Sequence, residues 1–385
     1  MPGTIDLRTG ITHSYRREDM ITKIAACDAY GECPMWHAFL QRVTDEDLEL
    51  QHYLQRVAGY CLTGSTREHV LFFFYGTGAN GKGVFLNTLR DIWHDYGAVA
   101  PMETFIKTYN DRHPTELAYL RGVRLVIAQE TERGRRWDES KIKALTGGDP
   151  ISARFMRQDF FEYVPQFKIL IAGNHKPSLH GVDEAIRRRL HLIPFTVTIP
   201  PAERDLDFRE KLRPEWPGIL QWAIDGCALW QQRTLDPPAA VKNASEEYFA
   251  EEDVLGRWID ERCALDKIYT TLSSELFENW VQWAESARER PGSQKAFSQN
   301  LAARGFTAKH TMSGTMLSGS HRRQGRGTDL RRKSRSTKSC DPAEEANLQH
   351  HPGPEIDDDF TAQNAPVKNA TVTAAPTRLS SNDRT

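Results

Sequence analysis

Residues 76–84 read Gly76-Thr77-Gly78-Ala79-Asn80-Gly81-Lys82-Gly83-Val84, and this segment is the strongest indication of the fold in the sequence. The apolar run 70–75 precedes it, and apolar residues at helical spacing follow it, so a strand, a turn and a helix are predicted in that order. Glycines let successive backbone N–H groups point at phosphate oxygens, and the helix N-terminus and Lys82 add positive potential. The stretch therefore predicts a phosphate-binding loop for a nucleoside triphosphate. A glycine-rich turn without a ligand is the alternative.

The loop lacks the hydroxyl that usually follows its lysine, because Gly83 stands where Ser or Thr is expected. Mg²⁺ must then depend on water, on the triphosphate and on acidic residues elsewhere. The next buried strand, 122–128, ends in Gln129-Glu130-Thr131-Glu132, at the edge where open α/β sheets bind ligands. Glu130 and Glu132 are therefore candidates for holding hydrated Mg²⁺ and for polarising the attacking water; solvated loop acids are the alternative.

A third buried strand is predicted at 167–173, and a polar amide follows it directly at Asn174. An amide at the mouth of this strand can hydrogen-bond both the γ-phosphate and the attacking water. Asn174 is therefore the candidate sensor of an intact triphosphate. An asparagine after a strand is also a common turn residue.

Three adjacent arginines, Arg187, Arg188 and Arg189, lie inside an otherwise apolar stretch. Successive side chains cannot all face one way, so at least one is expected to point off the subunit. An arginine that reaches a neighbouring subunit's γ-phosphate contributes about 10³ to 10⁵ in rate, and it makes activity depend on assembly into a ring. The alternative is an ordinary basic surface cluster.

The order of these motifs resembles a known family, the superfamily 3 helicase domain of phage, plasmid and prophage primase-helicases, which is related to poxviral replication proteins. The resemblance extends over roughly residues 1–310. The motifs that carry it are GTGANGKG (76–83), RLVIAQETE (124–132), LTGGDPISAR (145–154), ILIAGNHKP (169–177) and RRRLHLIPF (187–195).

The resemblance implies an α/β fold of the P-loop NTPase class and AAA+ type, and an ATP-driven, Mg²⁺-dependent hexameric DNA helicase. In this family the nucleotide lies between subunits. Carried over by position, Lys82 is the phosphate-binding lysine and Asn174 the sensor, Glu130 and Glu132 form the acidic motif, and Arg188 or Arg189 is the finger. Relatives often have an aromatic residue where this chain has Arg187, so the register of the finger stays open.

Residues 151–163 read as two short strands around a turn at 156–159. In the resembling family the matching hairpin grips DNA in the central channel, which makes Arg154 and Arg157 the DNA-binding candidates, with Lys143 behind them. Basic groups on phosphates and an aromatic ring for stacking suit sequence-tolerant tracking of a single strand or fork. The alternative is a structural hairpin whose arginines pair with the acids of the same hairpin.

Composition adds little to these motifs. The chain of 385 residues has a net charge of −2, so DNA contact must be local rather than global. Six scattered cysteines lack the spacing of zinc sites, which predicts reduced and mostly buried thiols. No apolar stretch of membrane length and no signal peptide is evident. The expected compartment is the cytoplasm of a bacterial host.

Four regions are expected along the chain. They are a helical or collar region at 1–66, an ATPase core at 67–200, a helical and winged-helix-like region at 201–312, and a disordered tail at 313–385. Apolar spacing predicts two helices between residues 34 and 63, which either support oligomerisation or merely pack on the sheet.

The leading hypothesis is a ring helicase of a phage or prophage replication system. One alternative is an origin-binding initiator or loader that uses ATP without processive unwinding, and another is a prophage remnant that binds nucleotide and does little. Primase activity is not expected in this polypeptide, so a separate primase or replication protein would supply primers.

Overall fold

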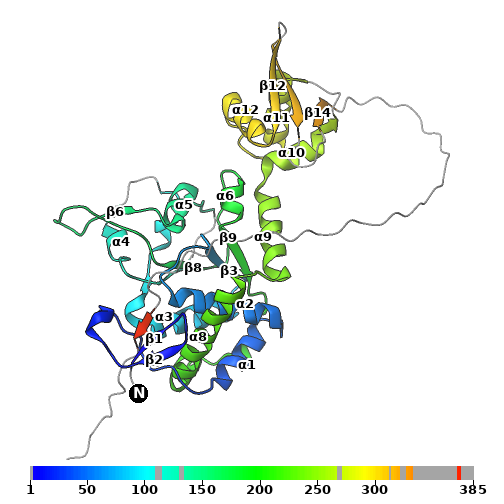
Figure 1. The fold of residues 1–385 in the computed structure, drawn as a ribbon. Coiled ribbons are helices and arrows are strands. Elements are labelled where there is room, and N and C mark those ends of the chain that lie inside the picture. The colour runs from blue at the N-terminus through cyan, green and yellow to red at the C-terminus, as the bar shows by residue number, and fades with distance from the viewer. Residues whose placement is uncertain are drawn as a thin grey trace, which may run out of the picture. The chain divides into compact units, whose positions relative to one another are not determined.

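The computed structural model describes residues 3–108, 115–129, 134–266, 271–311, 314–320, 327–332 and 371–373 (Figure 1). The described residues fall into two compact units. The first runs to Glu252 and includes 371–373, and the second begins at Asp253.

A parallel five-stranded sheet forms the centre of the first unit, with strand order β4-β5-β8-β3-β9. Figure 1 labels three of these strands, β3, β8 and β9. The loop after β3 leaves the sheet between two neighbouring strands, β8 and β9, at the carboxyl edge where open α/β sheets bind ligands. The mixed α/β class predicted from the sequence is confirmed at this level. The strands are β3 (Leu71–Tyr75), β4 (Gly97–Val99), β5 (Leu125–Gln129), β8 (Lys168–Gly173) and β9 (Leu190–Pro194).

Apart from Gln129, Lys168 and His191, the residues of the sheet strands are apolar, because both faces of the sheet are covered. On β3, Phe72 and Phe74 belong to the core on one face, whereas Leu71 and Phe73 belong to the core on the other. Side chains alternate across a strand, so a continuous apolar run fills both cores at once. This explains why the predicted strands lack polar alternation.

Nine α-helices are described in the first unit, and the predicted pair between residues 34 and 63 is confirmed. Glu215 caps the first of them from far along the chain, since its carboxylate accepts from the backbone N–H groups of Met35 and Trp36, both at 2.9 Å. The α-helices are α1 (Pro34–Val43), α2 (Leu48–Leu62), α3 (Lys82–Trp93), α4 (Thr115–Ala118), α5 (Glu139–Gly147), α6 (Glu184–Arg187), α7 (Phe208–Lys211), α8 (Trp216–Arg233) and α9 (Ala239–Glu252).

Helices α2 and α8 pack backbone to backbone through two glycines. A Cβ on Gly59 would lie 2.0 Å from the backbone nitrogen of Cys227, and one on Gly226 would lie 2.1 Å from the carbonyl oxygen of Gln55. Residues of α1, α2 and α8 share one core with the sheet. The helices that precede and follow the motif region therefore pack with the sheet as one unit, and this unit runs to Glu252.

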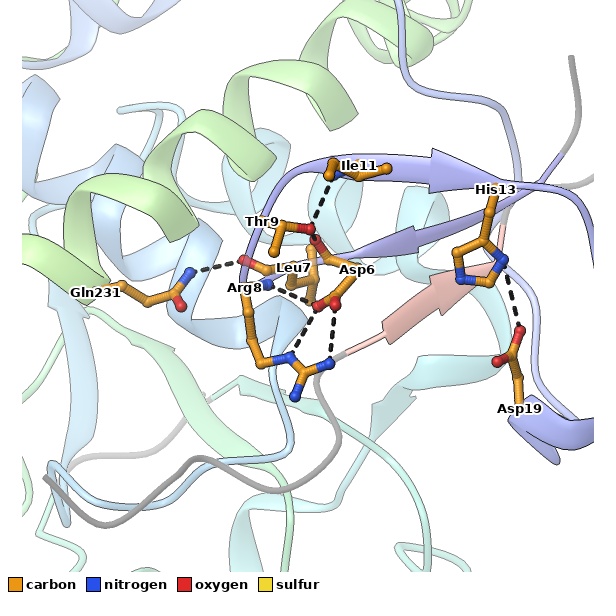
Figure 2. Close-up of polar contacts among 8 residues, drawn as sticks. All are labelled: Asp6, Leu7, Arg8, Thr9, Ile11, His13, Asp19 and Gln231. Carbon is orange, nitrogen blue, oxygen red and sulfur yellow. Dashed lines mark hydrogen bonds and ion pairs between the residues drawn. The ribbon is translucent and has the colours of Figure 1, made fainter.

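The N-terminal strands β1 (Thr4–Asp6) and β2 (Ile11–His13) form an antiparallel sheet with β15 (Thr371–Thr373). Figure 2 shows the turn between β1 and β2, where Arg8 Nη2 donates to Asp6 Oδ2 at 2.8 Å. Gln231 on α8 donates to the carbonyl oxygen of Leu7 at 2.7 Å (Figure 2). This bond fastens the N-terminal turn to the helical layer.

The second unit has a separate core around Trp258, whose ring lies 5.7 Å from Trp280 and 5.4 Å from Phe297. Its strands pair antiparallel, and two of them, β13 and β14, lie in the tail that was expected to be disordered, as does β15. The elements of the second unit are α10 (Val254–Arg262), β10 (Cys263–Asp266), β11 (Thr271–Leu272), α11 (Ser273–Ser286), α12 (Gln294–Ala303), β12 (Phe306–Thr311), β13 (Gly314–Ser320) and β14 (Gly327–Arg332).

Two further expectations from the sequence concern the cysteines and membrane-spanning helices. The five described cysteines form no disulfide, and all except Cys27 are buried, as predicted. Among the described helices, none combines the length and the apolar character that crossing a membrane requires.

Candidate nucleotide-binding site

The loop between β3 and α3 turns through left-handed backbone at Gly78 (φ 103°), Ala79 (φ 49°) and Gly81 (φ 83°). At Gly81 a Cβ would lie 2.6 Å from Val43 Cγ1 and 2.8 Å from Phe39 Cε2. Glycine is therefore required at position 81 for two reasons, its positive φ and the close approach of α1.

The chain that follows β9 supports the loop from behind. Asn80 Nδ2 donates to the carbonyl oxygen of Phe195 at 2.8 Å, and the N–H of Ile199 donates to the carbonyl oxygen of Ala79 at 2.8 Å. A Cβ on Gly76 would lie 2.0 Å from the same Phe195 oxygen. The loop is thus fixed to the strand that follows the arginine run.

Lys82 begins α3, and its side chain is 6% exposed. Its ammonium group donates to the carbonyl oxygen of Gly76 at 2.8 Å, to Asn80 Oδ1 at 3.1 Å and to Asn174 Oδ1 at 3.3 Å. Burial lowers the pKa of Lys82 to about 8. Asn174 directly follows β8, so two residues that the sequence assigned to phosphate binding and sensing lie in contact.

A cavity of about 420 Å³ opens beside this lysine, at the carboxyl ends of β3, β5 and β8. Gln129, the last residue of β5, is a lining residue that the sequence analysis did not single out, although it follows an apolar strand just as Asn174 does. The cavity is lined by Gly78, Ala79, Asn80, Gly81, Lys82, Gly83, Val84, Gln129, Ala172, Gly173 and Asn174.

The predicted acidic motif, Glu130 and Glu132, lies outside the described residues. Gln129 is the last residue of β5 and directly precedes this motif in the sequence, and it lines the cavity. Among the described residues, no three His, Cys, Asp or Glu side chains gather as a metal cluster would require. The role of the two glutamates stays a prediction.

The three arginines differ in their surroundings. The Arg187 guanidinium lies over the ring of Phe249, 5.2 Å from its centroid. Arg189 is 8% exposed and donates to the carbonyl oxygen of Ala185 at 2.8 Å, and burial lowers its pKa. Arg188, between them, is exposed. Of the three, Arg188 is therefore the arginine whose side chain faces away from the subunit's core.

The predicted hairpin exists, with β6 (Ile151–Ala153) antiparallel to β7 (Phe161–Tyr163). Its connection spans 154–160, longer than the turn at 156–159 expected from the sequence. Arg157 is exposed in this connection at φ 60°, and Arg154 lies over the ring of Phe160, 4.6 Å from its centroid.

The arginines of the hairpin do not pair with its acids. Within the described part of the chain, neither Arg154 nor Arg157 forms an ion pair with Asp159 or Glu162. Lys143 on α5 instead pairs with Asp183 at 2.6 Å, which ties it to the start of α6.

Two aromatic residues of the hairpin have different environments. Phe155, expected to be available for stacking on bases, is stacked on Phe161 with ring centroids 5.8 Å apart and touches Tyr119 edge-on. Phe160 is 58% exposed. The accessible aromatic ring beside Arg154 is therefore that of Phe160.

Fold and site together define an α/β protein with a glycine-rich loop and a cavity at the carboxyl edge of a parallel sheet. Family models match two parts of the chain: "D5 N terminal like" at residues 2–45 and a family of unknown function, DUF5906, at residues 74–189. The second match begins in β3 and ends in the arginine run, so it contains the described site.

Relatives among known proteins come from large DNA viruses. The chain is 26% identical over 314 residues to "Putative helicase L207/L206" of Acanthamoeba polyphaga mimivirus. The aligned region covers 74% of this chain and 32% of the relative. It is 24% identical over 276 residues to "Putative helicase 022R" of Frog virus 3, covering 65% and 28%. "Primase D5" of Fowlpox virus is 26% identical over 163 residues, covering 40% and 20%.

These matches confirm the resemblance stated from the sequence: the chain is similar to viral proteins named as helicases and to a poxvirus primase, and its N-terminal part matches the D5 N terminal like family. It spans about a third or less of the length of these relatives. Among solved structures, the apo A form of the NrS-1 C terminal region has a TM-score of 0.47 at 11% identity and covers 76% of both chains. A TM-score below 0.5 is too low to support a conclusion.

Proposed function

We propose that this chain is the ATP-hydrolysing part of a replicative DNA helicase, a P-loop NTPase of AAA+ type that works as a ring. The observation that carries the proposal is the contact of Lys82 with Asn174 beside the cavity. A buried cation held by oxygen acceptors at the start of a helix, next to a glycine-rich loop, suits a phosphate group. The names of the viral relatives support helicase as the activity.

Nucleotide binding would exchange one acceptor of Lys82 for another. The ammonium group has three oxygen acceptors, and a β- or γ-phosphate oxygen would replace one of them. Release of Asn174 Oδ1 from Lys82 would free that amide to contact the attacking water. The side chain of Asn174 would thereby report whether a triphosphate is bound.

Two further groups complete the proposed chemistry. Glu130 and Glu132, just beyond Gln129, would hold hydrated Mg²⁺ and orient the attacking water. When bound with the nucleotide, Mg²⁺ would neutralise charge on the phosphate oxygens. Arg188 would reach the nucleotide of a neighbouring subunit, because it is exposed while Arg187 and Arg189 are engaged within their own subunit.

DNA would meet the hairpin of β6 and β7. Arg157 and Arg154 have no carboxylate partner within the described residues, so their charges are available to phosphates. Phe160 offers an exposed ring on which a base can stack. A ring of such hairpins would track a single strand as ATP is hydrolysed.

Strand separation tests this function. Purified protein is given a forked DNA duplex with ATP and Mg²⁺, and release of one strand is followed over time. We expect ATP-dependent release that is lost in Lys82→Ala and retained in Lys242→Ala, which removes an exposed lysine of α9. DNA-stimulated hydrolysis without strand release would favour an initiator or loader, and no ATP binding would refute the proposal.

A further inference from the structure

The segment that begins at the candidate sensor is fastened to the last turns of α9. We call residues 174–179 the sensor segment. The hydroxyl of Tyr248 donates to the carbonyl oxygen of Pro177, and Glu252 Oε2 accepts from the N–H of Leu179 at 2.6 Å. Helix α9 is described throughout, and none of its residues lines the cavity. The backbone that carries the sensor is therefore held by a helix outside the candidate site.

Lys176 joins the sensor segment to two other elements. Its ammonium nitrogen lies over the rings of Tyr75 and Tyr248, 5.0 Å and 5.5 Å from the two centroids. It also lies 3.8 Å from Glu251 Oε2. Tyr75 is the last residue of β3, directly before the glycine-rich loop, whereas Tyr248 and Glu251 belong to α9. A single side chain therefore links the sensor segment, the start of the loop and α9.

Of these contacts, those with the rings are expected to hold the lysine. The side chain of Glu251 is 69% exposed, and an ion pair of this kind contributes little in solvent. An ammonium group within about 6 Å of an aromatic centroid is attracted by the ring, and more strongly where water is partly excluded. Tyr248 is buried and the side chain of Lys176 is 25% exposed, so this condition is met.

Tyr248 gives the sensor segment a rigid support. Trp137 Nε1 donates to the hydroxyl of Tyr248 at 3.1 Å, and the N–H of Trp137 donates to the carbonyl oxygen of Ser178 at 3.0 Å. The Trp137 ring is buried and meets Phe73 of β3 edge-on, with centroids 5.6 Å apart. Because buried polar groups with hydrogen-bond partners keep a defined position, the tyrosine is a fixed point for the segment. The position of the segment then depends on how firmly it is held to this point.

We infer that Lys176 is a positioning residue for the proposed hydrolysis of ATP. Its contacts with the two tyrosine rings hold the sensor segment in the place from which the Asn174 amide reaches Lys82 and, when ATP is bound, the attacking water. This inference rests on the proposed function. Asn174 is supported on one side by β8 and on the other by Lys176, two residues later. A displacement of about 1 Å in a group that orients reactants can cost roughly 100-fold in rate, even when the altered residue touches no substrate.

Substitution of Lys176 separates this role from nucleotide binding. Lys176→Met keeps the apolar stem and removes the charge that the rings attract, so kcat for ATP hydrolysis is expected to fall roughly tenfold to 100-fold. KM and the affinity for a fluorescent ADP analogue are expected to stay at the wild-type values, because the loop and Lys82 are unchanged. The unfolding temperature is measured for every variant, since a packing role would lower it.

Three further variants complete the test. Lys176→Arg keeps a cation that can lie over the rings, so it is expected to retain most of the rate. Lys242→Met, which replaces an exposed lysine of α9, is the matched control and is expected to behave as wild type. In the background of Asn174→Ala, Lys176→Met is expected to cost little more, because the group that the lysine positions is already gone. Single-turnover hydrolysis at excess protein makes these slow rates measurable.

Four results would overturn the inference. They are an unchanged kcat in Lys176→Met, an equal loss in Lys176→Arg, a loss by the same factor when Asn174 is already alanine, and a loss of ADP binding together with a lower unfolding temperature. The third would mean that the lysine acts independently of the sensor, and the fourth that it only supports packing. Failure of the proposed function is distinguishable, because the wild-type protein would then hydrolyse no ATP.

Discussion

Lys82 is a buried cation whose acceptors are neutral oxygens. Within the described part of the chain it forms no ion pair, and burial alone lowers its pKa to about 8, from an ordinary lysine value of 10.5. A phosphate group would restore the missing counter-charge. Binding of an anion is therefore expected to stabilise the charged form of Lys82 more than it would stabilise that of an exposed lysine.

This pKa predicts how nucleotide affinity depends on pH. Phosphate binds the charged ammonium form, which predominates below pH 8, so affinity is expected to be constant there. Above pH 8 binding must first take up a proton, and the dissociation constant rises toward roughly tenfold per pH unit. Titration of a fluorescent ATP analogue between pH 6.5 and 9.5 at fixed Mg²⁺ measures this. Lys82→Arg should remove the dependence, and a flat wild-type profile would contradict it.

The sequence predicts which residues belong to the candidate site better than it predicts which of their side chains are in contact. Lys82 and Asn174 were expected at one edge of the sheet because both follow apolar runs, and the structure brings them together. The same rule applied to Gln129 would have found another lining residue.

The packing of α2 on α8 depends on two glycines that bring the helix backbones together. Gly59→Ala would place a methyl group 2.0 Å from the backbone nitrogen of Cys227, where no flexible side chain can yield. We predict a loss of about 3 kcal/mol or more in unfolding free energy, at the upper end of overpacking effects. Chemical denaturation measures it.

Gly181→Ala is the matched control for this substitution. A Cβ on Gly181 meets no atom within 4 Å, and its backbone is not left-handed. We expect its midpoint of denaturation to be within error of wild type or slightly higher. Equal stabilities of the two alanine variants would show that the helices can move apart at little cost.

The hairpin of β6 and β7 makes a separate prediction. Arg157→Ala should weaken binding of single-stranded DNA and reduce the slope of log affinity against log salt, because one phosphate contact is lost. ATP binding and thermal stability should not change, since Arg157 is exposed. Fluorescence anisotropy of a labelled oligonucleotide measures the effect, and Arg233→Ala, an exposed arginine of α8, is the control. Identical salt slopes for both variants would argue against DNA at this hairpin.

Strands that are buried on both faces could be predicted from the sequence, whereas strands without such an apolar pattern could not. The strands of the parallel sheet are apolar on both faces, and that pattern is visible without a structure. Strands β13 and β14 are rich in Gly, Ser, Thr and Arg. Besides its neighbour β12, β13 pairs with β11, and β14 pairs with β10, and both of these partners lie far back in the chain. Pairing through backbone hydrogen bonds leaves no compositional trace, so the sequence favoured disorder there.

The whole molecule consists of two units with separate cores. Trp258 is fully buried in the core of the second unit. We predict that Trp258→Ala lowers the unfolding temperature of the second unit and leaves that of the first unchanged. Differential scanning calorimetry would show one transition shifted, while nucleotide affinity stays at the wild-type value. If both units instead unfolded in one transition and nucleotide binding were lost, the stabilities of the two cores would not be independent.

We propose that ATP bound at one subunit's cavity is hydrolysed with help from Arg188 of the next subunit in a ring. The most direct measurement is ATP hydrolysis, with single-stranded DNA present, by wild-type protein mixed with increasing fractions of Arg188→Ala at constant total protein. We predict that the rate falls more steeply than the wild-type fraction, whereas mixtures with Arg233→Ala keep the full rate. A rate that falls only in proportion to the wild-type fraction would contradict coupled hydrolysis around a ring, because sites that act independently lose activity in that proportion.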